Sequence, residues 1–263
     1  MSKKKYTIVI IGNGKLALAW FDYLKQNSIV AELHFLIRSN SKNKIPKATN
    51  LHKKISTIQH PVDLFILAVS DRAILENARK VYNYFPKSMV WHCSGTHALV
   101  SLPQKQSLKM VVYPMYSFNG LHQTNWTQIP LFTEGLNTVF KKQLFYSLFN
   151  KKQTHYSTSF KDRQRVHLAA VIAQNFSNML LIWAESQLPK SFKNKKIWHP
   201  LLQYWIFNLK KYNPIELQTG PAVRNDSWII SQHLKLIPQS QLNKLYKLRS
   251  EEHTSELQSR VDI

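Results

Sequence analysis

The residues best suited to bind a ligand stand in one short turn near the start of the chain. An apolar run over residues 7–11 passes through two glycines, with the spacing G-x-G-x-x-A, into a helical pattern. In a dinucleotide-binding turn the first glycine permits the tight bend, the second lets the backbone approach a pyrophosphate, and the alanine keeps the helix close to the strand. A glycine turn that binds nothing is the alternative. We predict that a dinucleotide-binding turn is formed by Gly12, Asn13, Gly14, Lys15 and Ala17.

The residues after the second predicted strand, 32–37, bear on which dinucleotide would bind. Enzymes that use NAD place an acidic residue about 20 residues past the glycines, where it holds the ribose 2′-hydroxyl. Here Arg38 and Ser39 take that place, and a guanidinium beside a hydroxyl suits a 2′-phosphate. NADP is therefore favoured over NAD, with an ordinary surface arginine as the alternative. Glu32 begins its strand instead of ending it, which makes it a poor ribose ligand.

Two serines follow later strands at the same predicted edge of the sheet. Ser70 comes after the strand 63–69, and Ser94 comes after the strand 89–93. Because the carboxyl ends of parallel strands form the ligand crevice, we expect both serines to border the cofactor. For the first turn, capping of the next helix by Ser70 or Asp71 is the favoured structural role.

His92 and Cys93 end the strand that precedes Ser94. A lone cysteine on a strand is usually a small buried residue, and nothing nearby in the sequence completes a catalytic triad around it. For His92 we favour a hydrogen-bonded structural role over a catalytic one. The single cysteine excludes an internal disulfide and suits a reducing compartment.

The longest helical pattern, 162–188, carries a polar line within apolar surroundings. At 100° per residue His167, Gln174 and Asn178 fall on one face, and Asn175 lies beside it. Amide and imidazole groups among apolar side chains need hydrogen-bond partners. Those partners are either other helices or a substrate and the nicotinamide, and the sequence leaves both open.

Arg224 is a second candidate for binding an anion. It follows a Gly-Pro turn, and Asn225 or Asp226 can cap the helix that comes next. A guanidinium near a helix N-terminus favours an anionic group. An Arg–Asp pair that joins two helices is the alternative.

The elements that must position these residues change in kind along the chain. In the first half, short apolar runs alternate with helical patterns, which indicates a parallel α/β sheet covered on both faces. The predicted strands are 7–11, 32–37, 63–69, 89–93, 110–113 and 130–133, and the helices are 15–26, 71–85, 97–102 and 136–149. After about residue 155 the pattern is helical, over 162–188, 197–212 and 226–237. We predict a Rossmann-type doubly wound sheet over 1–153 and an all-α domain over 154–248.

Composition narrows the class of protein further. A hydrophobic content of 44% indicates a globular chain, and no apolar run reaches the ~18 residues of a membrane span. The charged N-terminus passes straight into a strand without a signal peptide, so we expect a cytoplasmic protein. The net charge of +22 is spread over many lysine runs, which makes nucleic acid an unlikely partner but helps to attract anionic ligands. We predict no metal site.

The last residues, 249–263, break with the composition before them. They are acidic, lack a helical apolar stripe, and resemble the translation of a sequencing-library adapter. We therefore treat 249–263 as an artefact tail and exclude it from fold reasoning. A genuine polar C-terminal helix is the alternative.

Four stretches together resemble one family, namely His92-Cys-Ser-Gly95, Tyr113-Pro114, His167-Leu-Ala-Ala with Asn175-Phe176, and Thr219-Gly-Pro-Ala-Val-Arg-Asn-Asp226. The chain resembles, over nearly all of residues 6–248, Rossmann-like proteins with a helical C-terminal domain of unknown function, DUF2520. The resemblance implies an NADP-type Rossmann domain joined to a helical domain like that of 6-phosphogluconate dehydrogenase, often as part of a dimer. By position, it implies that the cleft is faced by His167, Asn175, Thr219 and Arg224. Tyr116 and Lys15 depart from the residues common in the family.

These inferences converge on an NADP(H)-dependent oxidoreductase that acts on an unidentified small carbonyl, imine or hydroxy acid. In that hypothesis His167 donates the proton, Arg224 orients an anionic group, and Asn175 completes the catalytic set. We expect a homodimer that forms through the helical domain. The alternative is a non-catalytic Rossmann protein that senses a nucleotide or binds a partner.

Overall fold

The computed structural model describes residues 4–37, 50–105, 107–121, 124–149, 153–238 and 240–251. The chain divides into two compact units, Met1–Ile172 and Ala173–Ile263. The sequence predicted a domain boundary at 153/154, ahead of the long helix. The first unit also takes in the start of that helix, because Arg163 and His167 on it bond to groups of the sheet unit.

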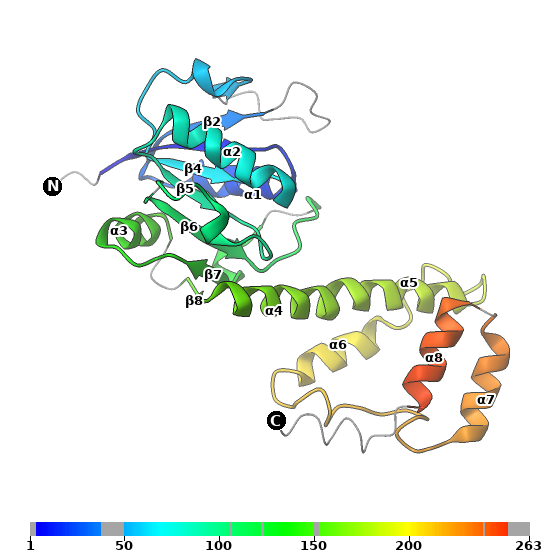
Figure 1. The fold of residues 1–263 in the computed structure, drawn as a ribbon. Helices are drawn as coiled ribbons and strands as arrows, with labels where there is room; N and C mark the ends of the chain where they lie inside the picture. Colours follow the sequence, from blue (N-terminus) through cyan, green and yellow to red (C-terminus); the bar gives the residue numbers. More distant parts are fainter. Residues whose placement is uncertain are drawn as a thin grey trace. The chain divides into compact units, whose positions relative to one another are not determined.

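The first unit is built around a sheet that, within the described residues, has eight strands in the order β3-β2-β1-β4-β5-β6-β7-β8 (Figure 1). The strands are β1 (Tyr6–Ile11), β2 (Val30–Leu36), β3 (Asn50–His52), β4 (Leu64–Leu67), β5 (Met89–His92), β6 (Lys109–Pro114), β7 (Leu131–Glu134) and β8 (His155–Ser157). Neighbouring strands pair in parallel except β6 and β7, which are antiparallel. The predicted doubly wound sheet is confirmed.

Helices cover both faces of this sheet because its strands are apolar on both sides. Side chains alternate along β1, so that Ile8 and Ile10 enter one core while Val9 and Ile11 enter the other. The first core is closed by α1 (Lys15–Leu24) and α3 (Val139–Leu148), and the second by α2 (Asp71–Tyr84) and the short 3₁₀ helix η1 (Ile55–Thr57). The near-continuous apolar runs of the sequence are therefore strands buried on both faces.

The order of the strands places a crevice beside β1. The chain runs from β1 outward to β2 and β3, then returns to form β4 on the other side of β1. The connections that leave β1 and β4 therefore diverge from the carboxyl edge of the sheet. Ligands of doubly wound folds bind at such a topological switch point.

Three local predictions of the first unit need correction. The helix predicted over 97–102 is only a 3₁₀ turn, η2 (Leu99–Ser101). The strands β3 and β8 were not predicted, because three residues are too few to show an apolar period. The strand predicted over 130–133 exists as β7, but it runs antiparallel to β6.

A continuous helical run, Phe160–Gln187, leads into the second unit. It consists of α4 (Phe160–Ala170), the π-helical segment η4 (Val171–Phe176) and α5 (Ser177–Gln187). A π segment has wider turns than an α-helix, so the 100° arithmetic that aligned His167 with Gln174 and Asn178 does not hold across it. The prediction that His167, Gln174 and Asn178 share one face of a regular α-helix therefore does not apply here.

The second unit continues with α6 (His199–Asn208), α7 (Ser227–Leu236) and α8 (Gln241–Glu251) (Figure 1). The helices predicted over 197–212 and 226–237 are confirmed as α6 and α7. The helix α8 was not predicted, and it includes Arg249 from the excluded tail. The remaining residues of that tail, 252–263, lie outside the described residues.

The run Phe160–Gln187 is long and apolar enough to span a membrane, by length and composition alone. The expectation that no segment meets this criterion was therefore wrong. A single helix of this kind is a weak indication, because the core helix of a soluble protein passes the same test.

Candidate functional site

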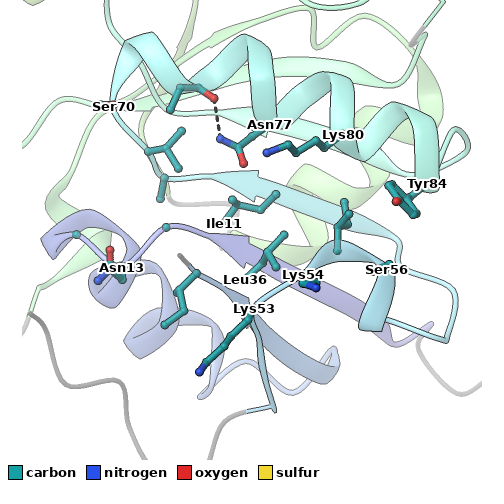
Figure 2. A pocket seen from close by; sticks show the side chains of 17 residues that line it. Ile11, Asn13, Leu36, Lys53, Lys54, Ser56, Ser70, Asn77, Lys80 and Tyr84 are labelled. Atoms are coloured by element: carbon teal, nitrogen blue, oxygen red, sulfur yellow. Dashed lines mark hydrogen bonds between the residues drawn. The ribbon is translucent and has the colours of Figure 1, made fainter. Parts of the chain in front are cut away.

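A cavity of about 760 Å³ opens at the carboxyl ends of β1, β2 and β4, within the size range of small-molecule sites (Figure 2). Gly12, Asn13, Gly14 and Ser70, which the sequence analysis assigns to cofactor binding, line it. The rest of its wall comes from β2, the β3–η1 segment and one face of α2. Its polar and charged lining residues are Asn13, Lys53, Lys54, Ser56, Ser70, Asn77, Lys80 and Tyr84.

Gly12 forms the bend of the turn and leaves no space for a side chain. Its φ of +119° lies where L-residues are strained, and a Cβ there would stand 2.2 Å from the carbonyl oxygen of Ala68. Its backbone N–H donates to the carbonyl of Leu36 at 3.0 Å. The glycine thus lets the chain pass closely between the ends of β2 and β4.

Gly14 differs from Gly12 because its vacant side is open. A Cβ on Gly14 would meet no atom within 4 Å, and its φ of −70° is ordinary. Gly14 is also the N-cap of α1, where the first-turn amides have neither a capping side chain nor an acidic residue beside them in the described helix. Open space in front of helix amides suits the approach of an anionic group such as a pyrophosphate.

The two remaining residues of the predicted turn lie away from the cavity wall. Ala17 is fully buried and packs α1 against the sheet, which is the role that the motif assigns to it. Lys15 begins α1 with an exposed side chain, and its aliphatic carbons lie near Gly120. Arg38 and Ser39, on which the preference for NADP rests, lie outside the described residues.

The sequence did not predict the basic wall of this cavity. Lys53 and Lys54 line it from the segment after β3, and Lys80 lines it from α2. The ammonium of Lys80 is paired with Glu76 at 2.6 Å. The sequence signal for this wall is weak: Lys53 and Lys54 are adjacent, and they follow β3, the short strand after the segment expected to hold the ribose.

Ser70 and Ser94, at the strand ends, differ in how they relate to the cavity: Ser70 lines it and Ser94 does not. Ser70 is the N-cap residue of α2, but its side chain makes no capping hydrogen bond, so the capping interpretation was wrong. The carboxylate of Asp71 instead accepts hydrogen bonds from Ser94 Oγ at 2.8 Å and from Thr96 Oγ1. Ser94 Oγ in turn accepts from the backbone of His97 at 2.9 Å. Ser94 therefore ties the β5 loop to α2, and it is not among the described residues that line the cavity.

His167 meets Tyr113 and Gly95 within the first unit. Its Nδ1 lies 3.0 Å from the phenol oxygen of Tyr113, and a Cβ on Gly95 would stand 2.7 Å from the imidazole Cγ. Burial raises the pKa of Tyr113, so the phenol keeps its proton and can donate it to Nδ1. Gly95, Tyr113 and His167 come from three of the four stretches that carry the family resemblance, and the structure brings these three residues into contact.

Arg163 holds α4 in the place that brings His167 to Tyr113. Its side chain is fully buried, and its guanidinium bonds to the carboxylate of Glu134 and donates to the carbonyl of His97 at 2.5 Å. His167 follows one helical turn later on α4. The sequence analysis did not single out this ion pair.

His92 and Cys93 are buried side chains with structural surroundings. Burial, followed by the charges of Arg163 and His97, lowers the pKa of His92 to about 3. Its Nδ1 accepts a hydrogen bond from the backbone N–H of Ser94 at 3.3 Å. Burial raises the pKa of the Cys93 thiol to about 12, so it is no thiolate nucleophile at neutral pH.

The buried neutral state of His92 predicts a loss of stability in acid. Its pKa of about 3 in the folded protein lies below the unfolded value of about 6.5, so the unfolded chain binds more protons between these pH values. We expect the His92 contribution to be complete above about pH 6.5 and to fall by about 1.4 kcal/mol per pH unit below it. Urea unfolding at pH 7.5 and 5 measures this. His92→Phe should have a shallower pH dependence, and an unchanged slope would contradict the prediction.

Asn175 and Arg224 belong to the second unit, where both are exposed. Asn175 lies in the π segment η4, a kind of helical irregularity that is frequent at functional sites. Arg224 stands just before α7, whose N-cap Asp226 accepts a hydrogen bond from the backbone of Ile229 at 3.1 Å. The predicted cap is confirmed, while the catalytic roles of Asn175 and Arg224 stay predictions.

Comparison with known proteins finds one family model that matches part of the chain. Residues 129–253 match the sequence model of DUF2520, a domain of unknown function. A search of curated proteins finds no similar sequence. The matched region begins earlier than the helical domain predicted over 154–248, because it includes β7, α3 and β8.

Solved structures share the fold over nearly the whole chain. A "putative NADP oxidoreductase" from Bacteroides fragilis matches with a TM-score of 0.78 and 23% identity, over 94% of this chain and 96% of its own. An imine reductase from Myxococcus stipitatus in complex with NAD⁺ matches with a TM-score of 0.59 and 12% identity, over 94% and 93%. Pyrroline carboxylate reductase from Plasmodium falciparum with NADP bound matches with a TM-score of 0.57 and 12% identity, over 95% and 96%. We conclude that the chain has a Rossmann-like fold and that its residues 129–253 resemble DUF2520.

Proposed function

We propose that this protein is an NADP(H)-dependent oxidoreductase that acts on a small carbonyl, imine or hydroxy acid. The observation that carries the proposal is the cavity at the topological switch point, with the strained Gly12 and the open Gly14 at its mouth. The similar solved structures with bound NADP or NAD⁺ support a nicotinamide dinucleotide as the ligand. Such a cofactor supplies or accepts a hydride when bound.

The residues of the cavity fit the pyrophosphate and the adenosine ribose of a dinucleotide. The amides of the first turn of α1, behind Gly14, face the side on which the pyrophosphate would lie. Lys53 and Lys54 provide positive charge near the end of β2, where the ribose of the adenosine half would lie. Because a 2′-phosphate adds negative charge at that ribose, these lysines favour NADP over NAD.

His167 is the proposed proton donor. Tyr113 donates to Nδ1, so the imidazole proton stands on Nε2, facing away from Tyr113. When Nε2 gives that proton to a substrate oxygen or nitrogen, Nδ1 receives the phenol proton of Tyr113, and the phenolate regains a proton from solvent. Gly95 is required at its position because a side chain there would displace the imidazole. We assign Asn175 to hydrogen bonding with the substrate and Arg224 to an anionic group of the substrate.

Titration calorimetry with NADPH and NADH tests the proposal. We expect the wild-type protein to bind NADPH more tightly than NADH. Replacing Lys53 and Lys54 together with alanine should weaken NADPH binding by about 10- to 100-fold, because charge-assisted contacts to the 2′-phosphate are lost. NADH binding should change little.

The control removes the same charge away from the cavity, in the double variant Lys87→Ala, Lys190→Ala, whose two lysines are exposed. It should bind both dinucleotides like the wild type. Failure of the wild-type protein to bind either dinucleotide would overturn the oxidoreductase proposal.

We further propose a cytoplasmic homodimer that forms through the helical unit. Large apolar side chains of that unit are exposed to an extent that is unusual for a monomer. They include Phe176, Met179, Ile182, Ile197, Leu201, Trp205, Ile206, Phe207, Trp228 and Leu236. Self-complementary pairing of one such surface is the commonest way to cover it. Sedimentation velocity tests the proposal, with twice the chain mass of 30.8 kDa as the expected result.

A further inference from the structure

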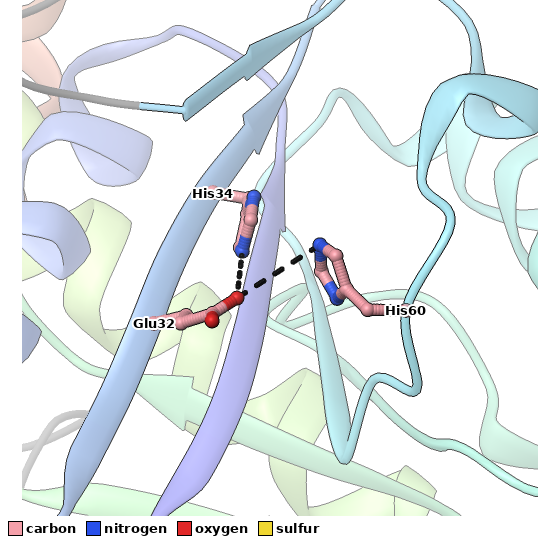
Figure 3. A group of neighbouring side chains, drawn as sticks. All are labelled: Glu32, His34 and His60. Atoms are coloured by element: carbon pink, nitrogen blue, oxygen red, sulfur yellow. Dashed lines mark hydrogen bonds and ion pairs between the residues drawn. The ribbon is translucent and has the colours of Figure 1, made fainter.

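Three metal-binding side chains converge beside the outer part of the sheet (Figure 3). They lie on the face of β2 that carries Leu36, which packs with residues of η1 and α2. Glu32 and His34 are two residues apart on β2 and therefore point to the same face. His60 comes from the loop between η1 and β4. One donor atom of each residue lies within 4.8 Å of the other two.

The separations approach those of a tetrahedral ion. His34 Nε2 lies 3.1 Å and His60 Nε2 lies 3.9 Å from the same carboxylate oxygen of Glu32. Ligand atoms around tetrahedral Zn²⁺ are roughly 3.3 Å apart, because each stands about 2.0–2.1 Å from the metal. Small rotations of the half-exposed Glu32 and His60 side chains would therefore bring the three ligand atoms to the separations found around Zn²⁺.

A chain of hydrogen bonds fixes the proton positions behind His34. The hydroxyl of Thr57 donates its single proton to the carbonyl of Lys54 at 2.8 Å. His52 must therefore donate from Nδ1 to Thr57 Oγ1 at 2.9 Å, which leaves His52 Nε2 as an acceptor. His52 Nε2 then receives the Nδ1 proton of His34 across 3.1 Å.

This chain leaves a neutral His34 with a lone pair on Nε2, and that lone pair faces the Glu32 oxygen 3.1 Å away. Two acceptors at that distance repel unless a cation lies between them. A proton would satisfy this one contact, whereas a divalent ion would also satisfy His60 Nε2. Metal-bound histidines commonly donate their other N–H to such a second partner, which is the arrangement that His52 provides.

We propose that Glu32, His34 and His60 form a zinc-binding site, with water as the fourth ligand. Two imidazoles and one carboxylate with no thiolate suit Zn²⁺, and the exposure of two of the three ligands gives the ion a path of entry. The ion would tie the segment from His52 to His60 to β2. That segment includes residues that line the cavity described above, but zinc binding itself does not depend on the proposed function.

The test uses the full-length protein without a histidine tag, stripped with EDTA and titrated with ZnCl₂ in a calorimeter. We expect one Zn²⁺ per chain, confirmed by elemental analysis after gel filtration. His60→Gln and Glu32→Gln should each weaken zinc binding by at least tenfold, and both change half-exposed side chains, so folding should be retained. Thr57→Val should weaken it about tenfold without removing a ligand, because it breaks the chain that orients His34 through His52.

The matched control is His155→Gln, which changes a histidine on β8 that contacts Tyr146. It should bind zinc like the wild type. Binding of less than one equivalent, or an affinity that His60→Gln and Glu32→Gln leave unchanged, would overturn the site and assign these side chains to a proton-bridged contact.

Discussion

Replacing Gly12 with alanine should both destabilise the protein and remove its binding of NADPH. The added methyl group would stand 2.2 Å from the carbonyl oxygen of Ala68, at a φ of +119° that alanine rarely adopts. Backbone strain of this kind costs about 1–3 kcal/mol, and the clash with a fixed strand end adds to it. We expect the free energy of unfolding to fall by about 2–4 kcal/mol and the NADPH affinity to fall at least ~100-fold.

Gly14→Ala separates the two effects of that change. A methyl group at Gly14 meets no protein atom within 4 Å, so stability should stay within about 0.5 kcal/mol of the wild type. It would occupy the side from which a pyrophosphate approaches α1, so NADPH binding should still weaken about tenfold. Urea unfolding and titration calorimetry on both variants measure this. If Gly12→Ala bound NADPH normally, the phosphates would not lie at this turn.

The glycine turn and the sheet could be predicted from the sequence because each depends on residues that are close together in the chain. The bend at Gly12 depends on its immediate neighbours, and each buried strand shows itself as an apolar run. The cavity wall is different, because Lys53 and Lys54 reach it only after the chain has formed β3 and returned toward β4. No periodic pattern in the sequence indicates that the chain turns back toward β4 and brings these lysines to the cavity.

Side-chain partners were harder to predict than positions. Ser94 does stand at the carboxyl end of β5, as expected, but its hydroxyl donates a hydrogen bond to Asp71 on a different element. The face assigned to His167 and Asn178 assumed a regular α-helix, and the π segment between them changes the turn. The pairing of Glu134 with Arg163 joins β7 to α4 across 29 positions, and nothing in the sequence shows that the charged Arg163 is buried.

That ion pair carries the second large expected effect, on stability. The Arg163 side chain is fully buried, and it serves both the Glu134 carboxylate and the His97 carbonyl. Arg163→Met would leave both acceptors without their donor in a largely dry place. Removing one partner of a buried pair typically costs about 3–5 kcal/mol, and we expect a loss of unfolding free energy near the lower end, since Glu134 is partly exposed.

Arg165→Met is the matched control, because it makes the same change on the same helix at an exposed position. It should alter the free energy of unfolding by less than about 0.5 kcal/mol. The double variant Arg163→Met, Glu134→Leu should recover part of the loss, because apolar groups of similar volume often replace a buried ion pair at little cost. Equal stability of Arg163→Met and Arg165→Met would show that α4 is held on the sheet by packing alone. The contact between His167 and Tyr113 would then owe nothing to the buried charge one turn before it.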